Sequence, residues 1–301
     1  MGKSEAPWLL DPAADRWGAS ETLRRRAQPL LGTLVEVALQ TDSHTAFEHA
    51  SSAAFEVVNE VHRAMSFHDP LSDVRRISRA AAGDVLSVNP HTWNVLCLAR
   101  RMELDSGGLF NAAVAPALVG RGLLPRPDGA LIPVAQGLTD GLALLSQHRV
   151  HVLQPLWVDL GGIAKGYAVD CGVACLQALG VRAGLINAGG DMRAFGHVVH
   201  AVHLRFLGGL MRVASLQNGA LASSSNAELS ARKTPHIDPR CNRSACSAST
   251  VVVQACSAAV ADALTKVALL CPATADRLCA AGQTEWQADW RPFLHASQHA
   301  H

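Results

Sequence analysis

Residues 158–196 read VDLGGIAKGYAVDCGVACLQALGVRAGLINAGGDMRAFG, and no other stretch of the chain is as informative about its fold. A short apolar run over residues 157–160 predicts a strand, and residues 163–179 carry apolar side chains at helical spacing. Gly180 ends the predicted helix, and a second apolar run follows it. The stretch therefore predicts a strand, a glycine turn, a helix and a further strand.

The turn before the predicted helix has the features of a phosphate site. Gly161 and Gly162 let the backbone approach a ligand closely, and Lys165 falls in the first helical turn, where unpaired N–H groups and the helix dipole favour anions. The segment matches neither GxxxxGK[ST] nor GxGxxG. An ordinary strand-turn-helix-strand unit without a ligand is the alternative interpretation.

Outward from this stretch, helical and strand patterns are interleaved without a regular βαβ alternation. The predicted elements are a strand over residues 30–39, a helix over 46–65, a short helix with turns within 70–84, a helix over 89–105, a loop over 120–134, antiparallel strands within 198–215 and 219–223, a strand over 249–256 and a helix from residue 257 onward. This order predicts an α+β fold with mixed or antiparallel sheets and packed helices.

The same pass along the chain predicts its organisation. Residues 1–28 are polar and predict a loose N-terminal arm, residues 29–283 predict a single domain that could consist of two intimately joined lobes, and residues 284–301 predict a C-terminal tail. The proline-rich and glycine-rich loop over residues 120–134 is the best candidate for a hinge or boundary.

Composition narrows the function. A chain of 301 residues with 49% hydrophobic residues can bury a large core, and its net charge of +1 favours neither nucleic acid nor an anionic membrane as a partner. No run approaches the ~20 apolar residues of a membrane span. The N-terminal residues show no signal peptide and no lipoprotein-type cysteine, which predicts a cytoplasmic protein.

Five blocks in order resemble a known family. They are the central stretch DLGGIAKGYAVD with INAGGDMRAFG, PLLGTLVEV at residues 29–37, MSFHDPLSD at residues 65–73, SGGLFN at residues 106–111, and HIDPR at residues 236–240 with ADALT at residues 261–265. Together they resemble the signature of the ApbE family, the FAD:protein FMN transferases. The resemblance spans about residues 29–270.

The resemblance implies an ApbE-like, T-fold-like architecture and a phosphoryl transfer. FAD would be split at its pyrophosphate, FMN would be attached through a phosphoester to a Thr or Ser of a partner flavoprotein, and AMP would be released. Two alternatives stay open: a protein that binds FAD without transfer, and an FAD pyrophosphatase that yields free FMN and AMP.

The resemblance also implies flavin contacts. The positions that match the family's cofactor contacts are Leu31, His68, Leu109, Phe110, Asn111, Asp159, Lys165 and Ile237. Three of them depart from the usual pattern, because Leu31 stands for a methionine, His68 for a tyrosine that stacks on the ring system, and Asn111 for an aspartate.

A metal site is implied as well. By resemblance, Mg²⁺ would be held by Asp262, Thr265 and the backbone carbonyl of Gly162, and hard cations do prefer such oxygen ligands. Lys266 stands where many relatives have a threonine. It either forms a solvated pair with Asp262 or places its ammonium beside the pyrophosphate, so the metal dependence is the weakest part of the resemblance.

The candidate catalytic residues are His236 and Asp262. A hydroxyl that attacks phosphorus must lose its proton, and a histidine can accept one near neutral pH. His236 lies two residues before Asp238, whereas the family histidine usually lies three before, and a one-residue slip can turn a side chain to the other face of a strand. A surface loop histidine is the alternative.

Overall fold

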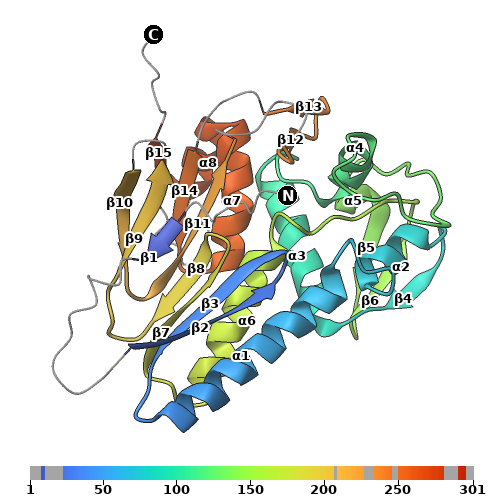
Figure 1. The fold of residues 1–301 in the computed structure, drawn as a ribbon. Coiled ribbons are helices and arrows are strands. Elements are labelled where there is room, and N and C mark those ends of the chain that lie inside the picture. Colours follow the sequence, from blue (N-terminus) through green and yellow to red (C-terminus); the bar gives the residue numbers. More distant parts are fainter. Residues whose placement is uncertain are drawn as a thin grey trace.

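The computed structural model describes residues 8–10, 23–206, 209–226, 234–245, 250–280 and 291–295. A seven-stranded sheet forms its centre, with strand order β15-β14-β11-β8-β7-β3-β2 and every pairing antiparallel (Figure 1). Its strands are β2 (Leu23–Leu30), β3 (Thr33–Gln40), β7 (Ala183–Ala188), β8 (Asp191–Phe195), β11 (Gly219–Ser225), β14 (Thr250–Ala255) and β15 (Arg291–His295).

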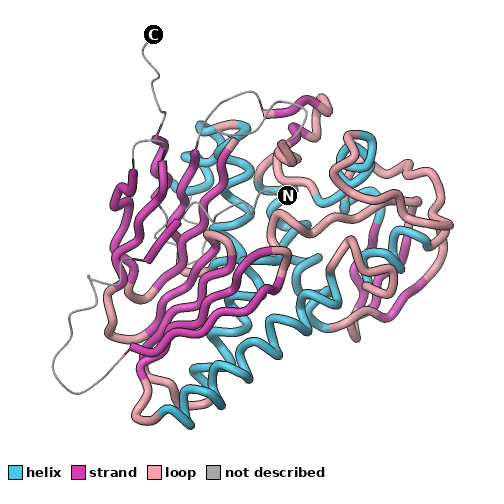
Figure 2. The backbone as a smooth tube through the Cα atoms, viewed as in Figure 1, coloured by secondary structure: helices cyan, strands magenta, loops and turns pink. Residues whose placement is uncertain are grey.

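Helices cover one face of this sheet and a smaller sheet covers the other. The helical layer consists of α1 (His44–Met65), α6 (Ala164–Ala178), α7 (Ala258–Leu270) and α8 (Pro272–Ala280), with α6 against both α1 and α7 (Figures 1 and 2). The smaller sheet has the order β1-β9-β10, with β1 (Trp8–Leu10), β9 (His200–Phe206) and β10 (Gly209–Leu216). All six residues of β7 are buried because both faces of the strand are covered.

A second group of elements lies beside the far end of α1 (Figure 1). Its helices are α2 (Asp73–Arg79), α3 (Pro90–Asp105), the 3₁₀ turn η1 (Ala112–Val114), α4 (Ala115–Gly120) and α5 (Leu138–Gly141). A three-stranded sheet of β4 (Val85–Ser87), β6 (Arg149–Val152) and β5 (Leu142–Leu145) completes it, and a separate hairpin pairs β12 (Ile237–Asp238) with β13 (Arg243–Ser244). One continuous hydrophobic core joins these elements to the helical layer.

Local sequence explains the long helix α1. The Ser43 side chain accepts a hydrogen bond from the Ala46 N–H, which caps the first turn, and the helix then buries Phe47, Ala54 and Val61 along one stripe. The prediction of a helix over residues 46–65 is confirmed. The helices predicted over residues 89–105 and from residue 257, and the strand over 249–256, are confirmed by α3, α7 and β14.

The predicted fold class is confirmed: the protein is α+β, with antiparallel sheets and packed helices. In the described residues, no helix is long and apolar enough to cross a membrane. The loop predicted over residues 120–134 is also present, since no helix or strand lies between Gly120 and Leu138.

The strand predicted over residues 157–160 is wrong, whereas the one over residues 30–39 is confirmed by β3. Residues 157–160 form no strand, because their N–H groups bond elsewhere: that of Val158 donates to Ser78 Oγ and that of Asp159 to the Ala112 carbonyl. The strand predicted over residues 30–39 is the second half of a hairpin. Its first half, β2, takes residues 23–28 out of the predicted loose arm, and Arg25 in β2 pairs with Glu36 of β3.

The C-terminal tail needs a similar correction. Residues 291–295 of the predicted tail form β15, which pairs with β14 at the edge of the main sheet. Pro292, Phe293 and Leu294 are three consecutive apolar residues between two polar ones, so the segment shows no strand alternation. The rest of residues 284–301, like residues 1–7 and 11–22 of the arm, lies outside the described residues.

Candidate active site

A cavity of about 920 Å³ lies where the main sheet, the helical layer and the second group of elements meet. Its wall brings together ten positions that the sequence singled out from five separate stretches. They are Leu31, His68, Leu109, Phe110, Asn111, Asp159, Gly162, Lys165, His236 and Ile237. Asp262 and Thr265, the other two, lie behind the wall and are fully buried. The volume is in the range of pockets that take cofactor-sized ligands.

Two tight hairpin turns build the sheet side of the cavity. Leu31 and Gly32 connect β2 to β3 with φ values of 56° and 72°, and Gly189 and Gly190 connect β7 to β8 with 66° and 100°. Two successive positive φ values suit the twist of a two-residue hairpin. A side chain at Gly189 would place its Cβ 2.7 Å from Thr33 Oγ1, so the two turns lie against each other.

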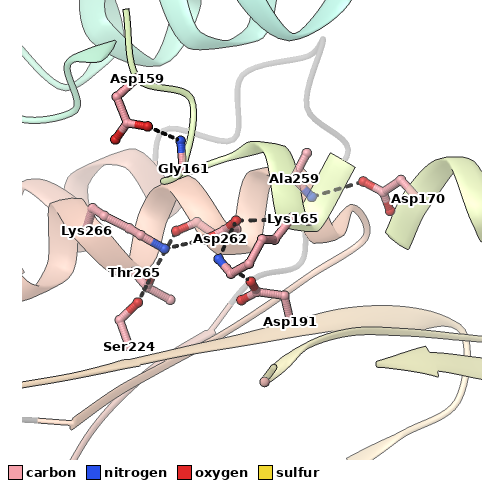
Figure 3. Close-up of polar contacts among 12 residues, drawn as sticks. Asp159, Gly161, Lys165, Asp170, Asp191, Ser224, Ala259, Asp262, Thr265 and Lys266 are labelled. Carbon is pink, nitrogen blue, oxygen red and sulfur yellow. Dashed lines mark hydrogen bonds and ion pairs between the residues drawn. The ribbon is translucent and has the colours of Figure 1, made fainter. Parts of the chain in front are cut away.

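Helices α6 and α7 meet at the floor with no room for a side chain at Gly166. A Cβ there would lie 2.1 Å from the Ala258 carbonyl oxygen. Each helix caps the other: the Gly166 N–H of α6 donates to Asp262 Oδ2 of α7 at 3.2 Å, and the Ala258 and Ala259 N–H groups of α7 donate to Asp170 of α6 at 2.9 Å (Figure 3). The first turn of each helix thus has its donors satisfied by a carboxylate of the other.

Beside this contact lie four charged residues, Lys165, Asp191, Asp262 and Lys266, which we call the charged cluster (Figure 3). Lys165 Nζ lies 2.8 Å from Asp191 Oδ2 and 3.5 Å from Asp262 Oδ2, and Lys266 Nζ contacts Asp262 Oδ1. The carboxylate side chains are 2% and 0% exposed, whereas those of Lys165 and Lys266 are 29% and 18% exposed. The two ammonium groups, and not the Asp262 carboxylate, therefore face the cavity.

The pKa values within the cluster follow from burial and charge. Burial alone would raise the pKa of Asp262, but the charges of Lys165 and Lys266 outweigh it and hold that pKa below its ordinary value. Burial would lower the pKa of Lys165, but the Asp191 and Asp262 carboxylates raise it above its ordinary value. Burial and repulsion by Asp262 raise the pKa of Asp191 to about 6, against the opposing charge of Lys165. Lys165 is thus held charged at neutral pH.

The residues implied for a metal do not fit a divalent cation. Both Asp262 oxygens already accept from ammonium or N–H donors, and Thr265 Oγ1 donates to the Asp262 carbonyl at 2.6 Å and bonds Ser224 Oγ at 2.8 Å. The Lys266 stem lies beside Gly162, where a Cβ would be 3.6 Å from Lys266 Cε. Within the residues that the structure describes, no group of three or more His, Cys, Asp or Glu could hold a metal ion.

The solvated pair that was one interpretation of Lys266 is not what the structure contains, because Asp262 is fully buried. A second interpretation, an ammonium that faces the phosphates, agrees with the place of Lys266 in the cavity wall.

His236 enters the cavity from the turn before β12. Its imidazole is half-buried, and burial together with the charges of Lys266 and Lys165 lowers its pKa to about 3. The ring is therefore neutral at physiological pH and has a lone pair with which to accept a proton. The alternative of an ordinary surface loop histidine does not agree with this position.

Arg121 ties this hairpin to the end of α4. At the end of α4, its guanidinium donates to Ser244 Oγ and, at 2.5 Å, to the Asn242 carbonyl. Asn242 has a φ of 54°, a conformation that asparagine tolerates better than most residues.

The remaining predicted contacts differ in how free their polar atoms are. His68 is exposed at the cavity wall. Both ends of the Asn111 amide are already hydrogen-bonded within the protein: Oδ1 accepts from the Ala113 N–H at 2.7 Å, and Nδ2 donates to the Gln136 carbonyl at 2.7 Å. Asp159 accepts from the Gly161 N–H at 3.0 Å, and burial raises its pKa against the pull of that N–H and of Lys165. Asp159 therefore shapes the turn that it precedes.

Sequence reasoning missed three residues that hold the site together. Asp170 caps α7 and pairs with Arg193 at 2.7 Å, Asp191 holds Lys165, and Ser224 bonds Thr265. Asp170 and Asp191 both lie within residues 158–196, as the acids of GYAVD and AGGD. The acid that directly follows the glycine pair of AGGD, Asp191, could have been recognised from the sequence as a candidate site residue.

The chain resembles one known protein family and several curated proteins of that family. A model described as the ApbE family matches residues 31–288. A curated FAD:protein FMN transferase of Rhodobacter capsulatus is 29% identical over 92% of this chain and 54% of its own length, and one of Vibrio cholerae is 27% identical over 46% and 44%. The chain thus spans about half the length of the curated relatives it matches.

Solved structures show the same fold. An ApbE protein of Thermotoga maritima superposes with a TM-score of 0.76 at 21% identity, covering 91% of this chain and 94% of the other. The apo form of the flavinyl transferase ApbE of Pseudomonas stutzeri superposes with a TM-score of 0.73 at 19% identity, covering 93% and 97%. At such identities the likeness establishes the fold alone.

Proposed function

This chain belongs to the ApbE family, and from that premise we propose that it transfers FMN from FAD to a Ser or Thr hydroxyl of an acceptor flavoprotein. One observation carries the proposal: ten positions that match the family's signature line a single cavity of about 920 Å³. Curated relatives named FAD:protein FMN transferase support the same activity.

The reaction divides between the two ends of the cavity. The flavin ring lies against the apolar wall, which we define as Leu31, Leu109, Phe110 and Ile237, and the pyrophosphate lies toward Lys165 and Lys266. The acceptor hydroxyl oxygen attacks the phosphorus of the FMN half, and the bond from that phosphorus to the bridging oxygen breaks. AMP leaves with the bridging oxygen, so the reaction consumes no water and needs no oxidant.

His236 takes the hydroxyl proton in this proposal and passes it to the departing AMP. Its low pKa in the free protein arises from burial and from the charges of Lys266 and Lys165, which outweigh the opposing charge of Asp262. A bound pyrophosphate adds negative charge beside the same ammonium groups, which raises the basicity of the imidazole when substrate is present. Binding of FAD thus makes His236 a stronger general base for the transfer step.

The proposed reaction does not require magnesium, and its effect on transfer is to be measured. The family resemblance implies it, but the donor set at Asp262 and Thr265 does not fit a divalent ion, and no step above depends on one. The cytoplasmic location expected from the N-terminal residues also stays a prediction, because residues 1–7 lie outside the described part of the chain.

Intact-mass measurement tests the function. The purified protein is incubated with FAD and a candidate acceptor, with and without Mg²⁺, and transfer predicts an acceptor heavier by one FMN with one AMP released. Free FMN and AMP without an acceptor would indicate a pyrophosphatase, and bound, unchanged FAD would indicate a binding protein. His236→Gln should slow transfer by about 10²-fold or more while FAD still binds.

A further inference from the structure

Lys266 occupies the place where the family resemblance puts a metal. Its stem passes Gly162, the residue whose carbonyl would be one ligand, and its Nζ ends on Asp262 Oδ1, which would be another. Figure 3 shows the Lys266 ammonium directed at Asp262. The cation in this position is therefore part of the protein.

The charge arrangement suits a fixed anion. The charged cluster holds two ammonium groups and two carboxylates, and the carboxylate side chains are more buried than the lysines. Lys165, Lys266 and Asp191 line the cavity and Asp262 lies behind them, so the cluster presents two ammonium groups and one carboxylate to a ligand. A pyrophosphate diester carries two negative charges, and two ammonium donors match them.

The residue type supports the same interpretation. Only four residues of the chain are lysines, Lys3, Lys165, Lys233 and Lys266, although lysine and arginine together number 26. Two of those four lie in this cavity. An ammonium is a compact point charge with three donors, which is closer to a metal ion in size and in directional freedom than a planar guanidinium is.

We propose that Lys266, together with Lys165, replaces the divalent cation as the partner of the FAD pyrophosphate, so that FAD binds without Mg²⁺. This inference rests on the proposed function, because it names how that site holds its substrate. It goes beyond the family resemblance, which implies a metal at this place.

Flavin binding in the presence of EDTA or MgCl₂ tests the inference. FAD and riboflavin are titrated separately into the wild type, Lys266→Met, Lys266→Thr and the exposed control Arg277→Met, and the flavin fluorescence is followed. Riboflavin has no phosphate, so it reports the apolar wall alone. Thermal unfolding of each variant shows whether it is folded.

We expect wild-type FAD affinity to be the same in EDTA and in MgCl₂. Lys266→Met should weaken FAD binding in EDTA about tenfold or more and leave riboflavin binding unchanged, because a charge-assisted hydrogen bond is lost. Lys266→Thr should bind FAD more tightly when Mg²⁺ is added, because it returns an oxygen ligand and frees Asp262. Arg277→Met should match the wild type.

The two proposals fail in different ways. FAD binding by the wild type that requires Mg²⁺, or a Lys266→Met protein that binds FAD as the wild type does, overturns the inference and leaves the proposed function standing. A wild-type protein that binds neither FAD nor riboflavin overturns the proposed function itself. If the Lys266 variants do not fold, the wild-type comparison in EDTA and MgCl₂ still decides the inference.

Discussion

The two ends of the cavity are built in different ways. The charged cluster comes from α6, β8 and α7, whose backbones touch at Gly166 and whose first turns are capped by each other's carboxylates. The apolar wall comes from the hairpin turn at Leu31, the residues before η1 and the β12–β13 hairpin. At the charged end, the groups that would hold the substrate also hold the fold, whereas His68, on the cavity wall away from the charged cluster, is exposed and can change with little cost in stability.

The largest expected loss of stability at the charged end comes from removing the Asp262 carboxylate. Asp262→Ala leaves two ammonium groups without that counter-charge and the Gly166 N–H without its acceptor. Breaking a buried ion pair in this way costs about 3–5 kcal/mol. We expect the midpoint of thermal unfolding to fall by roughly 10 °C in a chain of this size, as measured by calorimetry.

A second variant shows whether charge is the reason. Asp262→Asn combined with Lys266→Met removes one charge of each sign and should recover part of the lost stability. Asp276→Ala, on the exposed face of α8, is the control and should unfold as the wild type does. Equal stability of Asp262→Ala and the wild type would show that the charged end is no part of the structural framework.

The helix contact offers the next largest effect. Gly166→Ala places a Cβ 2.1 Å from the Ala258 carbonyl oxygen, so α6 and α7 must separate, at a cost of about 1–3 kcal/mol in the free energy of unfolding. Gly120→Ala is a matched control, because a Cβ at Gly120 meets nothing within 4 Å. Urea denaturation that ranks the two variants equally would contradict the close contact.

His236 lies between the two ends and gives a pH dependence of stability. Its pKa is about 3 in the folded protein and 6.5 when unfolded, so between these values the unfolded chain binds the extra proton. The neutral imidazole thus contributes stability above pH 6.5 that is lost as pH falls toward 3. Because the ring is half-buried, we expect a total effect of about 1 kcal/mol.

His236→Gln should flatten this part of the stability curve when unfolding is followed in urea at a series of pH values. His44→Gln is the control, because the His44 side chain is 71% exposed. An unchanged dependence in His236→Gln would place the imidazole in solvent.

The smallest expected effect lies at the apolar end. His68→Tyr puts a larger ring on an exposed position of the cavity wall, and an aromatic pair contributes about 0.5–1.5 kcal/mol. FAD and FMN should both bind severalfold more tightly, because both carry the same ring system, and the thermal midpoint should not change. A gain confined to FAD in isothermal calorimetry would place His68 near the adenine or the phosphates instead.

The sequence located most of the cavity because glycine turns and their neighbours leave local signals. Leu31, Gly162 and Lys165 were found from short motifs, and the structure brings them to one wall. The periodicity over residues 46–65 likewise predicted α1, whose apolar stripe is regular. Such features depend on residues close together in the chain.

What the sequence left open depends on residues far apart. The i,i+4 spacing of Asp262 and Lys266 suggested a solvated pair, and only the packing of α6 over α7 buries it. Residues 157–160 have a strand pattern, yet the partners of their N–H groups are Ser78 and Ala112, from other parts of the fold. The charged residues of β2 made its segment look like a polar arm. In the structure, Arg25 of β2 pairs with Glu36 of β3 across the hairpin, and this pairing cannot be read from either segment alone.

The exchange of caps between α6 and α7 also constrains the order in which the chain acquires its structure. The paired residues are 88 to 96 positions apart, so neither first turn has its acceptor until both segments are present and a long loop has closed. Contacts of such separation form late on a folding pathway. During synthesis on a ribosome, residues 164–178 would be made well before residues 258–262 emerge, and the phosphate-facing lysines would acquire their buried counter-ions only at the last stage of assembly.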